Sequence, residues 1–397
     1  MTQRNIVLIS VDSLRANACP WIENPGFQTP TISKASRDGI SFTNAVSPGH
    51  ATPISMPEIF TGLRLPAIDK NEPQAAITQY HETVPERLSR QGYSTIGFTP
   101  NPFTSREFGF QAGFDSFEDF TERDRTLLDR IRSYVRENWQ NTAGGAARLV
   151  LNLAGQGDIT VGWREYFEEI LTAVDEASEP FFLWVFLLEP HWPYIPSSEH
   201  REDISIRDLV TNYSRSQVSN STMTEKDAKI LLNLYHRTVL DVDDFIEQLQ
   251  SALAAYDPAY VFHSDHGELF GEHDRWGHQG DLFRENIHVP LEVWNTEITE
   301  TISDPISLRE IPQIINRIAE GKPKEIANLT SLYATAHNGE GTLSAMGNGW
   351  IHYPDGGILS PSEIRDIGDN ILNRECQQIS ELRELRNICV DTATLQL

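Results

Sequence analysis

Apolar runs and amphipathic stretches alternate along most of the chain. Several short segments are almost continuously apolar or alternate with polar residues, as is typical of strands in a sheet that is covered on both faces. They lie at 5–11, 40–45, 92–98, 181–188, 260–262 and 291–294. Helical patterns separate most of them, at 29–37, 84–91 and 224–256. This β–α rhythm predicts an α/β fold around a largely parallel central sheet.

The pattern changes after residue 294, where we place a domain boundary. Residues 1–294 are expected to form the main, catalytic domain, and within it the mostly helical residues 120–178 are interpreted as an insertion or lid. Residues 295–397 are expected to form a smaller C-terminal α+β subdomain. Its predicted elements are a helix at 307–320, a small antiparallel sheet between 332 and 353, and a helical tail at 362–389.

The charge balance excludes some classes of partner. The chain has 57 acidic and 32 basic residues, so its net charge of −25 repels nucleic acid and anionic membrane surfaces. Only six of the basic residues are Lys. An acidic, Lys-poor composition favours a high-salt cytoplasm, where dense carboxylates keep a protein hydrated. Three scattered Cys and no visible secretion signal or membrane span also predict a cytoplasmic protein. Nothing in the sequence indicates an oligomeric state.

Carboxylate and imidazole groups are most concentrated in residues 261–290. Asp265 and His266 come where a predicted strand ends, and ligands bind at the carboxyl ends of strands in open α/β sheets. One hard oxygen and one borderline nitrogen are typical ligands of a divalent metal, and Gly267 is expected to let the backbone turn sharply enough for both to converge. Nearby are His273, Asp274 and His278. We therefore predict a metal or catalytic site here.

Other polar residues follow predicted strands and are expected at the same sheet edge. Asp12 and Arg15 follow the first strand, Asn101 the third and His191 the fourth. Each also has a structural interpretation, as a turn residue, a surface residue or loop packing. Residues 47–62 are dense in Pro, Gly and hydroxyls and open a helix near Pro57 or slightly earlier, where sequence statistics alone favour a capping hydroxyl over a nucleophile. Asp241, Asp243 and Asp244, in the helix predicted at 224–256, are assigned to a solvated face or turn.

These motifs together resemble the sulfatase branch of the alkaline-phosphatase superfamily, over most of residues 4–294. NIVLISVDSLRAN resembles the first strand and metal loop of the family, and TPTISKASRDGISFTNAVS resembles the segment that leads to the nucleophile. GYSTIGFTPNPF, LEPHWPY and HSDHGELFGEHDRWGHQGDLFRENIHVPL follow in family order. The resemblance implies an alkaline-phosphatase-like sandwich and an enzyme that hydrolyses or transfers sulfate or phosphate esters.

The resemblance also implies a nucleophile. Counting back from IFTG, which looks like the family's L-L-T-G, places it at Thr52. Sulfatases proper carry C/S-x-P-x-R, whose first residue is oxidised to formylglycine, but here the string runs from Thr52 to Met56 as TPISM. The formylglycine precursor and the arginine are both absent. The chain therefore resembles Thr-type, archaeal-type members, among them phosphotransferases and phosphodiesterases that attack with a metal-activated hydroxyl.

By the same resemblance, one divalent ion is expected. Its ligands would be Asp12, Thr52, Asp265 and His266. The family's usual second N-terminal aspartate is Ser13 here, which removes one hard oxygen. That loss favours Mn²⁺ or Zn²⁺, with Ca²⁺ as a further candidate.

The remaining polar residues receive substrate-directed roles. His191 matches the family's active-site histidine, and His278 falls where sulfatases often place a lysine, so either could bind the anionic group or protonate the leaving oxygen. Asn101 and Arg15 are expected to bind substrate. The histidines assigned mainly structural roles are His50, His263 and His288.

The expected partner is an anionic ester, such as one carried by a glycan or a lipid head group. Two alternatives stay open. One is sulfatase activity with Thr52 unmodified. The other is a non-catalytic protein of the same fold that binds an anionic glycan or lipid head group, since the arginine and the second aspartate are missing.

Overall fold

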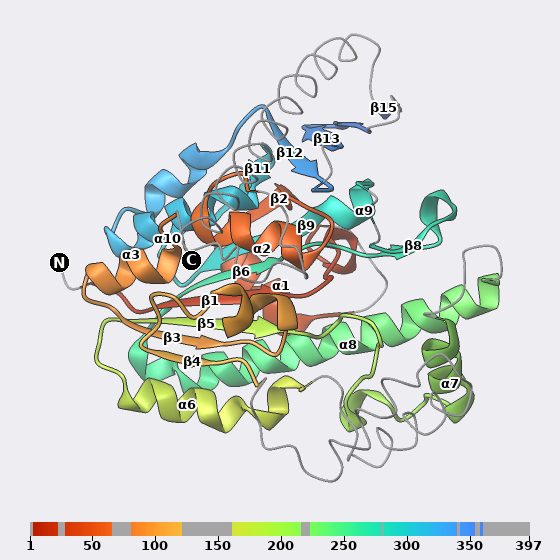
Figure 1. The fold of residues 1–397 in the computed structure, drawn as a ribbon, viewed down its shortest axis with the longest axis horizontal. Helices are drawn as coiled ribbons and strands as arrows, with labels where there is room; N and C mark the ends of the chain where they lie inside the picture. The colour runs from red at the N-terminus through yellow and green to blue at the C-terminus, as the bar shows by residue number, and fades with distance from the viewer. Residues whose placement is uncertain are drawn as a thin grey trace, which may run out of the picture.

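A large mixed sheet lies at the centre of the molecule (Figure 1). The computed structural model describes residues 3–22, 28–65, 81–120, 161–215, 223–278, 280, 282–339, 342–353 and 358–359. The sheet has nine strands in the order β10-β2-β9-β6-β1-β5-β3-β4, with β11 also beside β2. The strands are β1 (Ile6–Val11), β2 (Ile40–Val46), β3 (Ser94–Phe98), β4 (Ser116–Glu118), β5 (Phe181–Leu187), β6 (Ala259–Ser264), β9 (His288–Trp294), β10 (Glu300–Ile302) and β11 (Ile306–Ser307).

Most neighbouring strands run in the same direction, so the predicted largely parallel sheet is confirmed. Only β9 is antiparallel to its neighbours, β2 and β6. β1 lies between β5 and β6, and every residue of these three strands is buried. Their last residues are in register, because Val11 is opposite both Leu187 and Ser264. The residues that follow these strands therefore leave the sheet at one edge.

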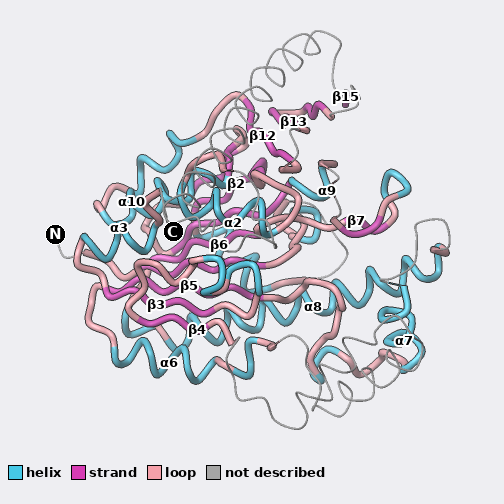
Figure 2. The backbone as a smooth tube through the Cα atoms, in the orientation of Figure 1, coloured by secondary structure: helices cyan, strands magenta, loops and turns pink. Residues whose placement is uncertain are grey.

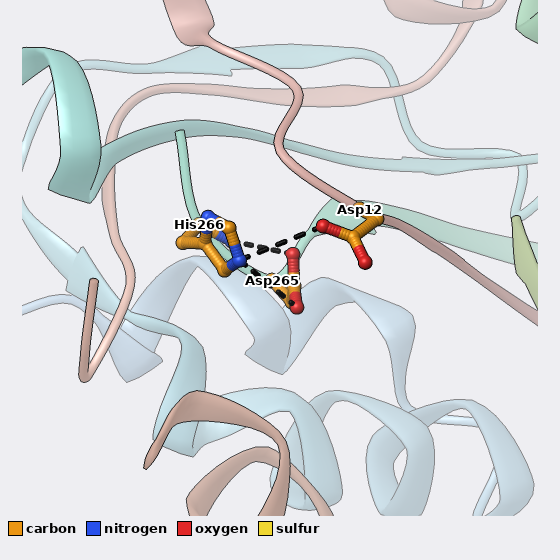
Figure 3. Close-up of side chains that lie close together, drawn as sticks. All are labelled: Asp12, Asp265 and His266. Atoms are coloured by element: carbon orange, nitrogen blue, oxygen red, sulfur yellow. Dashed lines mark hydrogen bonds and ion pairs between the residues drawn. The ribbon is translucent and has the colours of Figure 1, made fainter. Parts of the chain in front are cut away.

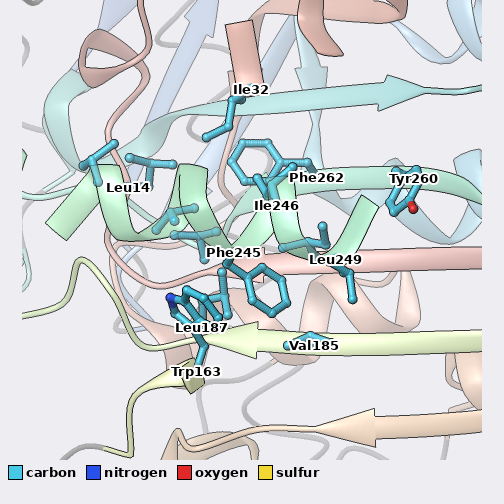
Figure 4. Close-up of a cluster of buried hydrophobic side chains, with 14 of the residues drawn as sticks. Leu14, Ile32, Trp163, Val185, Leu187, Phe245, Ile246, Leu249, Tyr260 and Phe262 are labelled. Carbon is cyan, nitrogen blue, oxygen red and sulfur yellow. The ribbon is translucent and has the colours of Figure 1, made fainter. Parts of the chain in front are cut away.

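Helices cover both faces of the sheet, which gives the expected sandwich (Figure 2). Alternate side chains of β1 divide between the faces, with Val7 and Ile9 in one hydrophobic cluster and Ile6 and Leu8 in the other. The first cluster includes α8, whose Phe245 packs beside β5 (Figure 4). The helices of this face are α1 (Pro30–Asp38), α6 (Phe167–Glu176) and α8 (Glu225–Ala252), and those of the other face are α2 (Thr52–Thr61), α3 (Val84–Arg90) and α10 (Ile311–Ala319).

The C-terminal part contributes strands to the large sheet and also forms a separate four-stranded sheet. β10 and β11 pair with β2, so a division of the chain at residue 295 would separate them from their partner. The small antiparallel sheet expected between 332 and 353 is confirmed: it begins at Tyr333, and its last described strand, at Ile358–Leu359, lies beyond the predicted end. Its strands are β12 (Tyr333–His337), β13 (Leu343–Gly347), β14 (Trp350–His352) and β15 (Ile358–Leu359).

Some predicted segments lie outside the described residues. These are residues 121–160 of the insertion predicted at 120–178, and the tail at 362–389. Two further α-helices of the described part are α7 (Ile206–Arg215) and α9 (Arg284–Ile287). No helix in the described ranges is long and apolar enough to cross a membrane.

Two local predictions differ from the structure. α2 begins at Thr52, and Pro57 lies inside it rather than at its start. Asp241 and Asp243 are buried, not solvated. Asp243 accepts hydrogen bonds from the backbone N–H groups of Thr31 and Ile32, 3.2 and 2.8 Å away, and so stabilises the start of α1. The pattern of one helix could not reveal donors supplied by a distant segment.

Candidate active site

Two carboxylates meet where β1 and β6 end. The backbone N–H of Asp12 donates to Leu187 O at 2.9 Å, and that of Asp265 donates to Val11 O at 3.0 Å. These bonds extend the strand pairing by one residue and hold both backbones at the sheet edge. Neither residue has exposed surface. Figure 3 shows the two side chains pointing toward each other and toward His266.

Asp12, Asp265 and His266 form a group that suits a metal ion. One ligand atom from each lies within 4.8 Å of the others. His266 Nε2 is 3.5 Å from Asp12 Oδ1 and 3.7 Å from Asp265 Oδ2. His266 Nδ1 lies 2.8 Å from Gly267 O, and because a carbonyl only accepts, Nδ1 carries the hydrogen. The lone pair is therefore on Nε2, which faces the carboxylates, as in metal-ligating histidines.

The electrostatics of this group also fit a cation. Burial and the neighbouring Asp12 raise the pKa of Asp265, while burial and His278 lower the pKa of His266. No Lys or Arg of the described residues forms an ion pair with either carboxylate. Two buried carboxylates without such a partner are unfavourable, and a divalent ion would neutralise them.

Ser13 occupies the place of the family's second aspartate. Its hydroxyl donates to Asp12 Oδ1 at 2.8 Å, and its backbone N–H donates to Asp265 Oδ1 at 3.3 Å. The backbone of Ser13 has φ of 61°, a left-handed conformation that is uncommon outside glycine. Ser13 thus orients both carboxylates rather than adding a charge.

Thr52 reaches the same group from α2. Its hydroxyl donates to Asp265 Oδ2 at 2.7 Å. The N-cap of α2 is Ala51, and no side chain caps the helix, so the Thr52 hydroxyl is not used as a cap. Asn101 donates from Nδ2 to Asp12 Oδ2 at 2.8 Å and to Thr52 Oγ1 at 3.3 Å. The structure therefore brings together the predicted ligands, the predicted nucleophile and Asn101.

A row of imidazoles extends from this group. The ring centroids of His266 and His278 are 4.5 Å apart, and those of His278 and His191 are 5.4 Å apart. His278 Nδ1 lies 3.1 Å from Oε1 of the buried Glu268. Burial lowers the pKa of His278, but Glu268, Asp12 and Asp265 outweigh it and raise this pKa to about 9. Sequence reasoning gave Glu268 no role, although its place directly after Asp265-His266-Gly267 was a signal.

The side chain of Arg15 binds another carboxylate of the protein. Its Nη2 is 2.8 Å from Glu272 Oε1, and its guanidinium lies 5.5 Å from the centroid of the Phe270 ring. The guanidinium that was expected to bind substrate is therefore paired with Glu272. A prediction from spacing could not anticipate Glu272, which arrives 257 residues later in the sequence.

Other residues singled out in the sequence have structural surroundings. His263 Nε2 lies 2.8 Å from Ser10 Oγ, and His288 Nε2 lies 2.8 Å from Thr43 O. His50 Nδ1 lies 2.6 Å from the backbone oxygen of His278, so it supports the loop that carries this histidine. His273 and Asp274 are exposed and lie outside the metal-ligand group.

Gly267 serves a different purpose from the one expected. Its φ is not in the left-handed region, but a Cβ at this position would lie 2.0 Å from Glu285 O. Another backbone therefore approaches closer than any side chain allows. Glycine is required here by space and not by a sharp turn.

The comparisons with known proteins agree with this geometry. The model of the Sulfatase family matches residues 4–352. This chain belongs to the Sulfatase family. The match spans the segments that carry Asp12, Thr52, His191 and Asp265. The chain is therefore an enzyme that hydrolyses or transfers sulfate or phosphate esters.

Relatives and solved structures lie at low identity. A multifunctional alkaline phosphatase superfamily protein of Trinickia caryophylli is 21% identical, over 82% of this chain and 79% of its own. An arylsulfatase of Clostridium perfringens is 22% identical, over 73% of this chain and 68% of its own. The crystal structure of a phosphonate monoester hydrolase of Agrobacterium radiobacter is similar with a TM-score of 0.64 and 15% identity, covering 97% of this chain and 96% of that one. This last likeness shows the alkaline-phosphatase-like fold.

Proposed function

We propose that this Sulfatase-family enzyme is metal-dependent and uses Thr52 as its nucleophile. One observation carries the proposal. The Thr52 hydroxyl lies 2.7 Å from Asp265 Oδ2, and Asp265 belongs to the group of two carboxylates and one imidazole. A hydroxyl in this position can be deprotonated and directed at an ester within one buried site.

Mn²⁺ or Zn²⁺ suits the donors better than Ca²⁺. Asp12 and Asp265 offer carboxylate oxygens, Thr52 a hydroxyl, and His266 a nitrogen that Ca²⁺ seldom takes. Ca²⁺ also prefers about 6–8 oxygen ligands, more than these residues supply. When bound, such an ion would lower the pKa of the nucleophilic hydroxyl and accept charge from a non-bridging ester oxygen.

The protein supplies the other requirements of the reaction. Asp265 accepts the hydrogen of Thr52, and Asn101 donates to Thr52 Oγ1, which favours negative charge on that oxygen. Thr52 is also the first residue of the ten-residue α2, where the helix dipole stabilises an anion. All three effects favour attack by Thr52 on an anionic ester.

His278 and His191 act on the substrate side. The buried Glu268 carboxylate, 3.1 Å from His278 Nδ1, favours a protonated imidazole, so His278 can supply positive charge that the family's arginine, Met56 here, does not. A protonated imidazole can donate to the ester oxygens or give its proton to the leaving oxygen. His191 lies next to it and can share either role.

We infer phosphate esters as the preferred substrates. The formylglycine precursor is replaced by Thr52, and an unmodified hydroxyl activated for attack is the arrangement that phosphoryl transfer uses. Sulfate esters with an unmodified Thr52 are the second candidate. An enzyme is favoured over a protein that only binds an anionic glycan or lipid head group, because the chain has Asp12, Thr52, His191, Asp265 and His266.

Side-by-side assays of an aryl sulfate, an aryl phosphate and a bis-aryl phosphate test the proposal. We expect EDTA to abolish turnover and Mn²⁺ or Zn²⁺ to restore it, with the fastest rates on a phosphate ester. Undiminished turnover in EDTA would contradict metal dependence, and turnover of the sulfate alone would contradict the phosphoryl preference. A chain that holds no ion after dialysis into either metal, and turns over no ester, would be a binding protein.

A further inference from the structure

A pocket of about 190 Å³ adjoins the row of imidazoles. The residues that line it include His191, other residues of the loop after β5, and Arg201. The rest of the lining is Val161, Gly162, Arg164 and Glu165 before α6, and Thr238 and Asp241 of α8. Because His191 also neighbours His278, the pocket begins on the side of the site where the leaving oxygen would be protonated. Its volume is below the roughly 300–1,000 Å³ of pockets for drug-sized ligands, so it suits a small group.

Glu189 lines the pocket and carries an unsatisfied hydrogen-bond acceptor just behind its surface. Glu189 Oε1 accepts from the backbone N–H of Trp163 at 3.3 Å. Glu189 Oε2 is buried and has no hydrogen-bond partner among the described residues. Burial and the nearby Asp241 raise the pKa of Glu189 to about 7. A buried acceptor without a donor is unfavourable, and a donor on a bound ligand would remove that cost.

The guanidinium of Arg164, one of the two arginines that line the pocket, is already engaged. Arg164 lies 2.8 Å from carboxylate oxygens of both Asp241 and Asp244, and its guanidinium stacks 4.2 Å from the centroid of the Trp163 ring. Trp163 is itself buried, and its Nε1 donates to Asp241 O at 3.0 Å. These contacts fix the wall that holds Glu189, and they leave Arg164 poorly suited to bind a second anion.

We propose that this pocket receives the alcohol part of the ester, and that Glu189 Oε2 accepts a hydrogen bond from a hydroxyl or ammonium group on that alcohol. The inference rests on the function proposed for Thr52. Glu189 is then a specificity-determining residue that distinguishes alcohols with a second donor from plain alkyl alcohols. A plain alkyl alcohol would leave the buried Glu189 Oε2 without a hydrogen-bond donor. The cost of this unpaired acceptor is an effective basis for discrimination between the two kinds of alcohol.

The test compares three esters of whichever acid the aryl assays identify, namely the ethyl, 2-hydroxyethyl and 2-aminoethyl esters. With the metal-loaded full chain, kcat/KM for a donor-bearing ester should exceed that for the ethyl ester at least tenfold, equivalent to about 1.4 kcal/mol. Preference for the hydroxyl or the amino compound tells which donor the pocket takes. Equal values for all three esters would overturn the inference.

Glu189→Gln isolates the acceptor. The oxygen of the glutamine amide can still accept from the Trp163 N–H. Its NH₂ group, a donor, then replaces the acceptor Oε2. The ratio of kcat/KM for the donor-bearing ester to kcat/KM for the ethyl ester should fall toward one. Glu168→Gln makes the same chemical change on the exposed surface of α6 and should keep the wild-type ratio. An unchanged ratio in Glu189→Gln would overturn the inference.

A second variant covers the case in which Glu189→Gln does not fold. Gly162→Ala adds a methyl 3.2 Å from Glu189 Oε1, a contact close enough to displace the carboxylate, and should also lower the ratio. Turnover of aryl esters without alcohol discrimination refutes the pocket assignment alone. Absence of turnover of every ester by metal-loaded wild type refutes the function proposed for Thr52, and with it this inference.

Discussion

Asp12 and Asp265 are two buried carboxylates that lie close together in the site. Both are buried, each has its backbone hydrogen-bonded at the sheet edge, and Ser13 donates to both. Such a pair is stable in the folded chain only if its charge is reduced by a proton or balanced by a cation. This makes the stability of the protein sensitive to metal.

Asp265→Asn should therefore abolish the rise in Tm that Mn²⁺ or Zn²⁺ produces in the wild type. The amide keeps the shape but supplies no charge to the ion. Asp244→Asn is the matched control, because Asp244 belongs to the second group of potential ligands, with Glu199 and His200, and already pairs with Arg164. Thermal unfolding with and without metal measures the effect. A full metal-induced rise in Asp265→Asn would place the ion elsewhere.

Residues that follow strands were the easiest to predict from the sequence. Asp12, Asn101 and Asp265 lie together because their strands are parallel neighbours, or nearly so, and end at one edge. Glu268 and Glu189 received no role because a carboxylate's function depends on partners from distant segments. For Glu189, the partner comes from a segment 26 residues away. Pairing of this kind is set by tertiary packing, which local patterns do not record.

At the scale of elements, α2 is anchored at the end opposite to Thr52. Glu58 is buried in α2 and its carboxylate lies 2.9 Å from Arg309 Nη1 and 2.8 Å from His337 Nε2, on β12. It also accepts from the backbone N–H of Leu65 at 2.7 Å. This cluster joins the helix that carries the proposed nucleophile to the C-terminal sheet. The predicted helix near Pro57 gave no indication of it, since its partners follow some 250 residues later.

Glu58→Gln should lower the free energy of unfolding by about 3–5 kcal/mol, because it leaves a largely buried guanidinium without its counter-charge. Urea unfolding measures this loss. Glu300→Gln, on the exposed part of β10, is the control and should stay within about 0.5 kcal/mol of wild type. A loss in Glu58→Gln no larger than in the control would show that the cluster does not anchor α2.

The same cluster predicts a pH dependence. Burial raises the pKa of Glu58, but His337 and Arg309 outweigh it, and the pKa in the folded chain is lowered. The stabilisation is therefore complete above the unfolded pKa, near 4.3, and is lost as the pH falls through the folded value. The stability difference between wild type and Glu58→Gln should shrink below about pH 4. A difference that is constant down to pH 2 would contradict this origin.

For the whole molecule, the sequence predicted the sandwich because buried parallel strands have a distinctive apolar pattern. It did not predict that β10 and β11 extend the large sheet, since two- and three-residue strands carry no readable periodicity. Charge acts at this scale too. The net charge of −25 produces repulsion that salt screens, with a Debye length that falls from about 10 Å at 0.1 M to about 3 Å at 1 M.

Tm of the metal-free chain should therefore rise between 0.1 and 1 M KCl. Thermal unfolding at several KCl concentrations measures the effect, and glycerol at matched viscosity serves as a control that leaves charges unscreened. A Tm that stays constant or falls with KCl would show that the acidic surface does not limit stability.

The role of Thr52 is the central claim, and kcat/KM of two variants tests it most directly. Thr52→Ala removes the hydroxyl that contacts Asp265, so turnover of the best aryl ester should fall by several orders of magnitude, while Thr52→Ser keeps the oxygen and should be far milder. Tm and metal content should show that both variants fold and hold the ion. If Thr52→Ala instead keeps kcat/KM within about tenfold of wild type, or about 1.4 kcal/mol in the barrier, Thr52 is not the nucleophile.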